Sequence, residues 1–174
     1  MGATAPPGSG SGLERAKALI RRFVEEGINQ GQLAVFDEIL DDAFPTPDRV
    51  DSGSSAVKEA IAAYRQAVPD ARWTIEEQVA EGEMVMSCFV ASGTHHGPLW
   101  GIPATGQPMA IWGILISRCP GERIVEQRIQ LDRLGLLQQL GVMPELGLEE
   151  VVIVARLLQA SQPWTGRGAG LPQP

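Results

Sequence analysis

The first third of the chain carries apolar residues at the spacing of amphipathic helices. From Leu13, apolar side chains recur every three or four positions, and this run ends at Gly27 and Gly31. Two shorter runs with the same spacing cover residues 33–40 and 57–68. The pattern therefore predicts three helices, all of which precede any strand.

After Pro69 and Asp70 the apolar spacing falls to two, which is the repeat of a strand with one buried face. The strands predicted from this alternation cover residues 73–79, 84–95, 109–118 and 123–132. Short turns join the first strand to the second and the third to the fourth, so we expect an antiparallel meander. Helices followed by strands predict an α+β domain in which a curved sheet covers the helices.

The two ends of the chain differ in composition from this central part. Residues 1–12 are mostly Gly, Pro, Ser and Ala, so they can bury little surface and are expected to be disordered. The folded domain is predicted to cover residues 13–142. Residues 143–160 combine helical spacing with a Val-Val-Ile-Val run that would also suit a strand. We interpret them as a helical extension, and residues 161–174 as a flexible tail.

Composition and charge narrow the classes of partner. A chain of 174 residues is long enough for one domain with a substantial core. Its 14 basic and 21 acidic side chains give a net charge of -7, which repels nucleic acids and anionic membranes, so neither is an expected partner. Two cysteines provide no disulfide framework, and no apolar run reaches membrane-spanning length. We therefore expect a cytoplasmic protein.

The last predicted strand, residues 123–132, carries polar side chains on one face and ends in an acid. By parity, Arg128, Gln130 and Asp132 point to the same side. Such a face usually meets water, but in a curved sheet it could line an internal pocket. Desolvation there would raise the pKa of Asp132 and make it a usable acid or base near neutral pH. The alternative is that Asp132 caps a helix that begins at Arg133.

Three further side chains are candidates for substrate contact in such a pocket. Arg128 could bind a substrate carboxylate or enolate oxygen. Arg118 could reach the same pocket, or it could pair with Glu126 or Asp132 across the hairpin. Trp100 lies in a Gly- and Pro-rich connection, where it could cover the mouth of a pocket.

Metal and cofactor motifs are not evident in the sequence. His95 and His96 are adjacent in a predicted strand, so they point to opposite faces and cannot easily bind one ion. The connection over residues 97–107 has neither the lysine of a phosphate-binding loop nor the glycine spacing of a dinucleotide site. We therefore expect no metal and no cofactor.

Four strings in the chain resemble the SnoaL-like polyketide cyclases, a branch of the NTF2-like superfamily. The strings are RFVEEGINQGQLAVFDEIL, AVPDARWTIEEQVAEGE, SGTHHGPLWGIPATGQPM and RIVEQRIQLDRLGLLQQLG, and together they lie within residues 14–141. The resemblance implies a cone-shaped α+β barrel, in which a curved antiparallel sheet and three amino-terminal helices enclose an apolar pocket. It also implies association through the outside of the sheet, usually into dimers or higher oligomers, and we expect a homodimer here.

The same resemblance implies a chemistry. Characterised members close a ring in a polyketide by intramolecular aldol condensation, without a metal or cofactor, and the acid that handles the proton matches Asp132. His95 lies in a matching string and is expected to contact the substrate as a donor or proton relay. The chain departs from the family at Gln127 and Arg128, where the family commonly has His and Trp. Ring-closing members also use histidines near the positions of Arg118 and Gln130.

Three hypotheses follow for the function. The first is a cyclase, or a related isomerase or dehydratase, acting on a hydrophobic carbonyl-bearing metabolite, with Asp132 as the catalytic residue. Its substrate-contacting residues would be His95, Trp100, Arg118, Arg128 and Gln130. The second is a non-catalytic module for small-molecule binding or assembly. The third, epoxide opening, would require a second acid in the pocket, for which Glu126 and Asp37 are the candidates.

Overall fold

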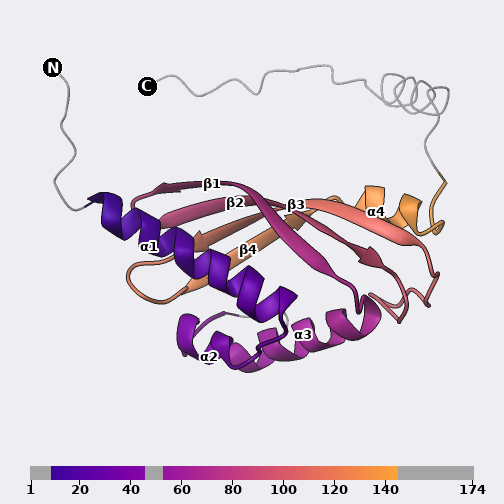
Figure 1. Ribbon diagram of the computed structural model, residues 1–174, viewed down its shortest axis with the longest axis horizontal. Helices are drawn as coiled ribbons and strands as arrows, with labels where there is room; N and C mark the ends of the chain where they lie inside the picture. The colour runs from indigo at the N-terminus through magenta and orange to yellow at the C-terminus, as the bar shows by residue number, and fades with distance from the viewer. Residues whose placement is uncertain (1–8, 46–52, 145–174) are drawn as a thin grey trace, which may run out of the picture. The chain divides into compact units, whose positions relative to one another are not determined.

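The computed structural model describes residues 9–45 and 53–144, which form helices followed by a single sheet (Figure 1). The helices that precede the sheet are α1 (Ser9–Arg22), the π-helix η1 (Phe23–Asn29) that continues it, α2 (Val35–Ile39) and α3 (Ser54–Ala67). The strands are β1 (Arg72–Glu81), β2 (Met84–Thr94), β3 (Pro108–Arg118) and β4 (Glu126–Leu131), and α4 (Arg133–Gln139) follows them. The α+β class predicted from the change of apolar spacing is confirmed.

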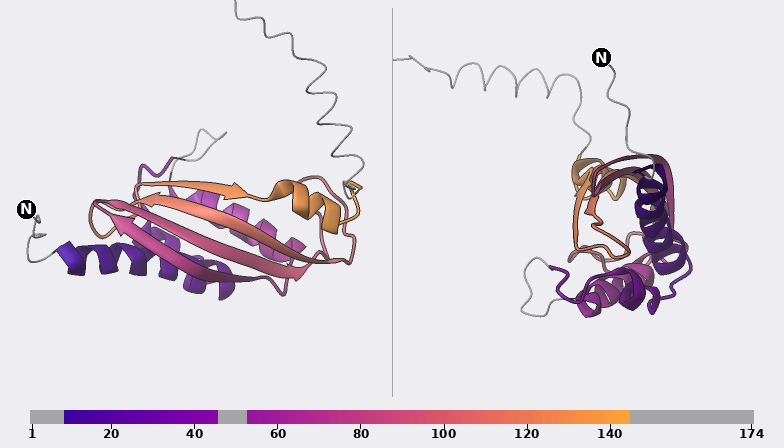
Figure 2. Two further views of the ribbon diagram at one scale, coloured as in Figure 1. Left: turned by 90° about the horizontal axis from the view of Figure 1, so that it is seen from above. Right: turned by 90° about the vertical axis from the view of Figure 1, so that its left-hand side faces the viewer.

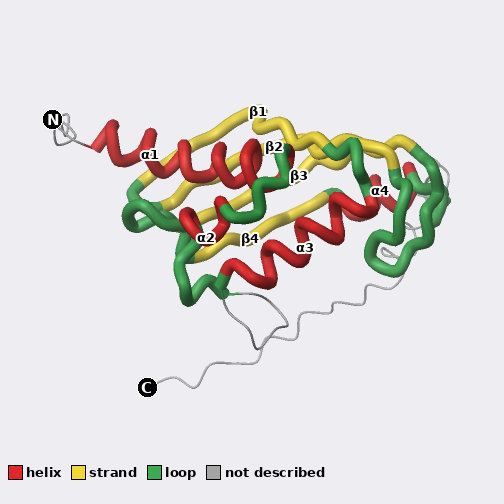
Figure 3. The backbone as a smooth tube through the Cα atoms, turned by 60° about the horizontal axis from the view of Figure 1, so that its bottom comes forward, coloured by secondary structure: helices red, strands yellow, loops and turns green. Residues whose placement is uncertain are grey.

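The four strands form an antiparallel meander in the order β1-β2-β3-β4. A register shift between Ile75 and Glu77 marks a bulge in β1, which adds to the twist of the sheet. Viewed along the strands (Figure 2), the sheet curves around the interior instead of lying flat. The helices α1, α2 and α3 lie on the same side of this curved sheet (Figure 3).

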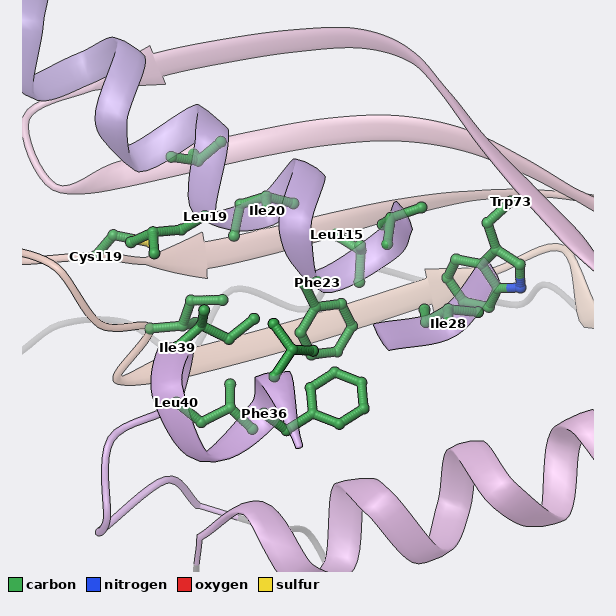
Figure 4. Packing of buried hydrophobic residues seen from close by; sticks show 14 of the residues in the cluster. Leu19, Ile20, Phe23, Ile28, Phe36, Ile39, Leu40, Trp73, Leu115 and Cys119 are labelled. Atoms are coloured by element: carbon green, nitrogen blue, oxygen red, sulfur yellow. The ribbon is translucent and has the colours of Figure 1, made fainter. Parts of the chain in front are cut away.

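The core lies between the helices and the concave face of the sheet (Figure 4). Phe36 and Phe89 are fully buried, and burial of each such side chain contributes about 1.5–3 kcal/mol. Trp73 stacks on Phe89 with ring centroids 4.3 Å apart. Gly27 allows the ring of Phe36 to approach η1, because a Cβ at this position would lie 2.4 Å from a ring carbon.

Two element boundaries differ from the sequence expectation. Helix α1 begins at Ser9 instead of Leu13, so residues 9–12, which were expected to be disordered, are helical. The Gly and Ser residues in this first part carry no apolar repeat from which the helix could be predicted. Strand β4 begins only at Glu126. The preceding Ile124 pairs instead with the segment that follows α2, where its N–H bonds the carbonyl of Ile39 at 2.7 Å.

Helix α4 follows β4 in the chain and is bonded to β3 beyond the part of that strand that pairs with β4. The side-chain amide of Gln139 bonds the backbone of Ala110 twice, because its Oε1 accepts from the N–H at 2.8 Å and its Nε2 donates to the carbonyl at 3.0 Å. These two bonds satisfy a stretch of β3 that has no partner in β4. They also fix α4 against the strand and so determine where its first residues lie.

Part of the sequence prediction lies outside the described residues. This applies to residues 1–8, to the helical extension over residues 145–160 and to the tail over 161–174. Within the part of the chain that the structure describes, no helix is long and apolar enough to cross a membrane.

Candidate functional site

The register of β4 determines which of its side chains face the interior. Residues opposite each other on neighbouring strands share a face of the sheet. Ile129 lies opposite the buried Leu115, whereas Arg128 lies opposite Ile116 on the outer face. Gln130 belongs to the same outer row as Arg128. The polar face of β4 therefore points away from the core, and Arg128 and Gln130 do not line the interior.

Arg118 is also on the outer face, in a cluster with Glu126 and Arg128. Arg128 donates from Nη2 to Oε1 of Glu126 at 2.7 Å, and Nε of Arg118 lies 3.5 Å from Oε2. The hydrogen bond from Arg128 is the main reason that the pKa of Glu126 is below its usual value. The cross-hairpin pair that the sequence left as an alternative for Arg118 is thus present. Arg128 is 78% exposed, so this cluster contributes little to stability.

Asp132 caps α4. Its Oδ1 accepts a hydrogen bond from the backbone N–H of Gly135 at 2.9 Å, and its own N–H bonds the carbonyl of Trp112 at 3.1 Å. Asp132 is exposed, as is the next residue, Arg133. Asp132 is therefore the N-cap of α4, which is the alternative that the sequence left open. The cap holds the carboxylate in one orientation.

A cavity of about 460 Å³ is lined by Trp100, Ile102, Arg133 and Leu137. Asp132 is not among these lining residues, but it directly precedes Arg133 in the chain. The guanidinium carbon of Arg133 is 5.6 Å from the centroid of the Trp100 ring, which places the cation over the aromatic face. The lining therefore combines apolar surface with one positive charge. Of these residues, sequence reasoning identified only Trp100. The sequence indicated Arg133 only as the first residue of a helix. Its contact with Trp100 joins a loop to α4, and residue spacing cannot predict such a contact.

Trp100 reaches this cavity from the tip of a small hairpin. The backbones of Leu99 and Ile102 exchange two hydrogen bonds of 3.0 and 2.9 Å. The two residues between them have positive φ, 50° at Trp100 and 82° at Gly101, as a two-residue type I′ turn requires. Trp is an unusual residue at a position with positive φ, so the backbone of Trp100 is strained in the conformation that places its ring at the cavity.

His95 lies on the interior side and is completely buried. Its Nδ1 is 3.0 Å from the hydroxyl oxygen of Thr105. Nε2 is buried and has no hydrogen-bond partner among the described protein atoms. His95 and Arg128 thus lie on opposite faces of the sheet, and the structure does not bring them together. His96 is exposed.

The interior also contains two polar side-chain pairs that sequence reasoning missed. Nε2 of Gln78 donates to the hydroxyl of Ser87 at 2.9 Å, and Nε2 of Gln127 donates to that of Ser117 at 3.0 Å. Both serines are fully buried. Their parity with neighbouring core residues could have revealed them, since each has the spacing of the buried apolar positions in its strand.

The two acids considered for epoxide opening lie on the surface. Glu126 belongs to the outer-face cluster described above. Asp37 accepts hydrogen bonds from Lys58 and Ser54, and the bond from Lys58 is the main cause of its lowered pKa. Neither acid lines the cavity beside Trp100. In the described ranges, no group of three or more His, Cys, Asp or Glu side chains is arranged to hold a metal ion.

Several large apolar side chains are exposed on the outer face of the sheet. They are Val79, Met84, Met86, Trp112 and Ile116, each at least 40% exposed. Val79, Met86 and Ile116 lie in one row across three strands. A contiguous apolar surface of this kind is typical of a protein contact.

Comparison with known proteins gives one family match. The family model described as SnoaL-like polyketide cyclase matches residues 18–140. No curated protein gives a significant match.

Solved structures share this fold. TsrD from Streptomyces laurentii is 26% identical with a TM-score of 0.70, over 75% of this chain and 97% of TsrD. AclR from Streptomyces galilaeus, described as a candidate hydroxylase, is 21% identical with a TM-score of 0.69, over 85% of this chain and 94% of AclR. A SnoaL-like polyketide cyclase from Agrobacterium tumefaciens is 16% identical with a TM-score of 0.64, over 72% of this chain and 98% of that protein. The last two likenesses concern the fold alone.

Proposed function

Because the chain belongs to the SnoaL-like polyketide cyclase family and has the NTF2-like α+β fold, we propose that it catalyses proton transfer on a hydrophobic carbonyl-bearing metabolite such as a polyketide. The reaction is an intramolecular aldol ring closure or a related isomerisation or dehydration. The observation that carries this proposal is the position of Asp132, whose carboxylate is fixed by the α4 cap directly before Arg133, a residue that lines the 460 Å³ cavity.

The proposed mechanism uses Asp132 as a general base and then as an acid. Its carboxylate removes a proton from a carbon next to a carbonyl, and the electron pair of the C–H bond moves into an enolate. The enolate carbon attacks a second carbonyl of the same molecule, and Asp132 returns the proton to the new alkoxide oxygen. The product of ring closure is therefore an isomer of the substrate. The cap engages Oδ1, and we assign proton transfer to Oδ2.

Arg133 and the apolar lining have complementary roles in this mechanism. The Arg133 guanidinium stabilises the negative charge that develops on the enolate oxygen. The Trp100 ring, over which this cation lies, provides an apolar wall for the substrate. Holding two carbonyls of one molecule at reacting distance contributes as much as the acid–base group, because it replaces an encounter with a fixed geometry.

The substitution Asp132→Asn tests this assignment. Asn is also a good N-cap residue, so the variant retains the helix cap but cannot accept the proton. We expect turnover of a 1,3-dicarbonyl ester that the wild-type protein converts to fall by about 10²- to 10⁴-fold, with an unchanged melting temperature. Full turnover by the folded variant would exclude Asp132 as the base.

We also propose a homodimer formed through the outer face of the sheet. The support is the exposed apolar row of Val79, Met86 and Ile116. Arg118, Arg128 and Gln130 lie on this same face. We place these three polar residues at the edge of the contact instead of in the substrate pocket.

A second candidate function is binding without catalysis. It is favoured by the cap at Asp132, since a helix cap alone would explain this acid, and by the separation of Arg128 from His95. Wild-type protein that binds 1,3-dicarbonyl esters with no conversion, and an Asp132→Asn variant that binds them with the same affinity, would support this alternative.

A further inference from the structure

Arg133 is the only charged residue among those that line the cavity beside Trp100. It is exposed, and within the described ranges no ion pair includes it. The adjacent acid, Asp132, does not neutralise it, because the carboxylate of Asp132 accepts the backbone N–H of Gly135 instead. Arg133 therefore presents a positive charge without a counter-charge to a ligand in the cavity.

The guanidinium of Arg133 has a defined position in this cavity. Its carbon lies 5.6 Å from the centroid of the Trp100 ring, and a cation over an aromatic face is attracted to it. The backbone of each partner is also held, since the Asp132 cap fixes the first turn of α4 and a hydrogen-bonded hairpin turn carries Trp100. A donor group that is already oriented loses less conformational entropy when a ligand binds.

The chemistry of a guanidinium favours a carboxylate over a neutral carbonyl group. Its N–H donors lie in one plane and form a fork that matches both oxygens of a carboxylate. This contact leaves other N–H donors of Arg133 for the enolate oxygen in the mechanism above. A ketone or ester placed at the same position would take water from the cation without supplying a negative charge. The ligand group that suits Arg133 is therefore an anion.

The rest of the lining is apolar. Ile102 and Leu137 are partly buried, and Leu137 lies on the same face of α4 as Arg133, four residues further along the helix. A single exposed ion pair contributes little to affinity, so contact with these walls and with the Trp100 ring must supply much of it. The complementary ligand thus has a flat apolar body with a carboxylate at its edge.

We propose that the cavity selects compounds that carry a carboxylate on a flat ring system, and that Arg133 determines this specificity. Arg133 binds the carboxylate, and the ring system packs against Trp100, Ile102 and Leu137. The chain has a net charge of -7, so the selection is local and does not come from attraction of anions by the whole protein. That such a compound is the substrate rests on the proposed function above, whereas the preference for an acid rests on the cavity alone.

A pair of matched probes tests this preference. 2-Naphthoate and 2-acetylnaphthalene have the same rings and nearly the same shape, but only 2-naphthoate is charged at neutral pH. In titration calorimetry of the full-length wild-type protein at low salt, we expect 2-naphthoate to bind about fivefold more tightly than the ketone. The difference should decrease as the salt concentration rises. Equal affinities, tighter binding of the ketone, or binding of neither probe would overturn the proposal.

Two arginine variants test whether Arg133 is the source of the preference. Arg133→Gln removes the charge and retains a polar side chain, so the folded variant should bind the two probes with equal affinity. Arg72→Gln is the matched control, because Arg72 is also exposed but lies in β1, outside the cavity lining. This control should keep the preference for 2-naphthoate.

The proposal fails if the preference persists in Arg133→Gln, or if Arg72→Gln loses it as well. Both titrations measure binding at equilibrium and do not depend on turnover. Failure here is therefore distinct from failure of the Asp132→Asn test, which concerns the proton transfer.

Discussion

The carboxylate of Asp132 occupies the space in which Gly135 would carry a side chain. Oδ1 accepts the N–H of Gly135 at 2.9 Å, and a Cβ built on Gly135 would lie only 2.3 Å from Oδ2. The first turn of α4 therefore requires a glycine at position 135, because the carboxylate that caps the helix fills the space of a side chain there. This contact makes the orientation of the proposed base sensitive to one methyl group.

Replacing Gly135 with Ala should displace the Asp132 carboxylate. An Ala substitution inside a helix normally raises the free energy of unfolding by about 0.5–1 kcal/mol, but here it would also break a cap worth about 1 kcal/mol. We therefore expect Gly135→Ala to give no net stabilisation in urea denaturation. Turnover should fall, because the carboxylate of the proposed base is displaced. Gly12→Ala is the matched control, because Gly12 lies in α1 with open space around its Cα, and it should be stabilising. Equal stabilisation by both substitutions would contradict the proposed contact.

Trp100→Asn should separate stability from ligand binding. Asn-Gly is a preferred pair for a type I′ turn, so this change should relieve the strain at φ 50° and raise the free energy of unfolding by about 1 kcal/mol. It also removes the aromatic wall of the cavity. Affinity for a naphthyl ketone such as 2-acetylnaphthalene, whose rings would stack on this wall, should therefore fall about tenfold. The measurements are urea denaturation and titration calorimetry. Gly101→Ala is the control, since it keeps the ring but strains the turn. A destabilised Trp100→Asn variant would argue against the turn assignment.

Cys119 should make stability depend on pH in the alkaline range. Burial raises the pKa of this thiol from 9.0 to about 11, so the unfolded chain releases the proton at lower pH than the folded one. The contribution to stability is complete below the pKa of the unfolded chain and decreases as pH rises toward 11. Urea denaturation should therefore show a steeper alkaline loss of stability for wild-type protein than for Cys119→Ala. An identical alkaline slope for the wild-type protein and Cys119→Ala would refute this role of burial.

Charged substitutions on the outer face should dissociate the proposed homodimer. Met86 and Ile116 are opposite each other in the register of β2 and β3, and each is 40% exposed. Introducing Lys at Met86 and Glu at Ile116 in separate variants would place charges in the apolar contact, which disfavours association. Sedimentation at micromolar concentration should show a dimer for wild-type protein and a monomer for each variant. Val142→Lys changes an exposed apolar residue outside the sheet and should leave the dimer intact; a monomeric wild-type protein would contradict the proposal.

The alternation of apolar residues was sufficient to predict the class of fold. Helical spacing and strand spacing are local properties, because they follow from which side chains must share one face of an element. They identified the helices before the sheet and the meander of strands. The N-cap at Asp132 was also accessible from local sequence, since the cap partner, Gly135, is only three residues away.

Only the tertiary structure decided which face of each strand points to the core and which points outward. Parity groups Arg128 with Gln130, but it cannot tell whether this group points inward or outward. That choice depends on the register with β3, which places Ile129 opposite the buried Leu115 and Arg128 on the outer face. The cavity beside Trp100, which brings a hairpin tip against α4, and the contact of Thr105 with His95 likewise depend on how separate segments pack. Sequence periodicity thus determined the elements and their faces, while packing decided which of those faces could hold a site.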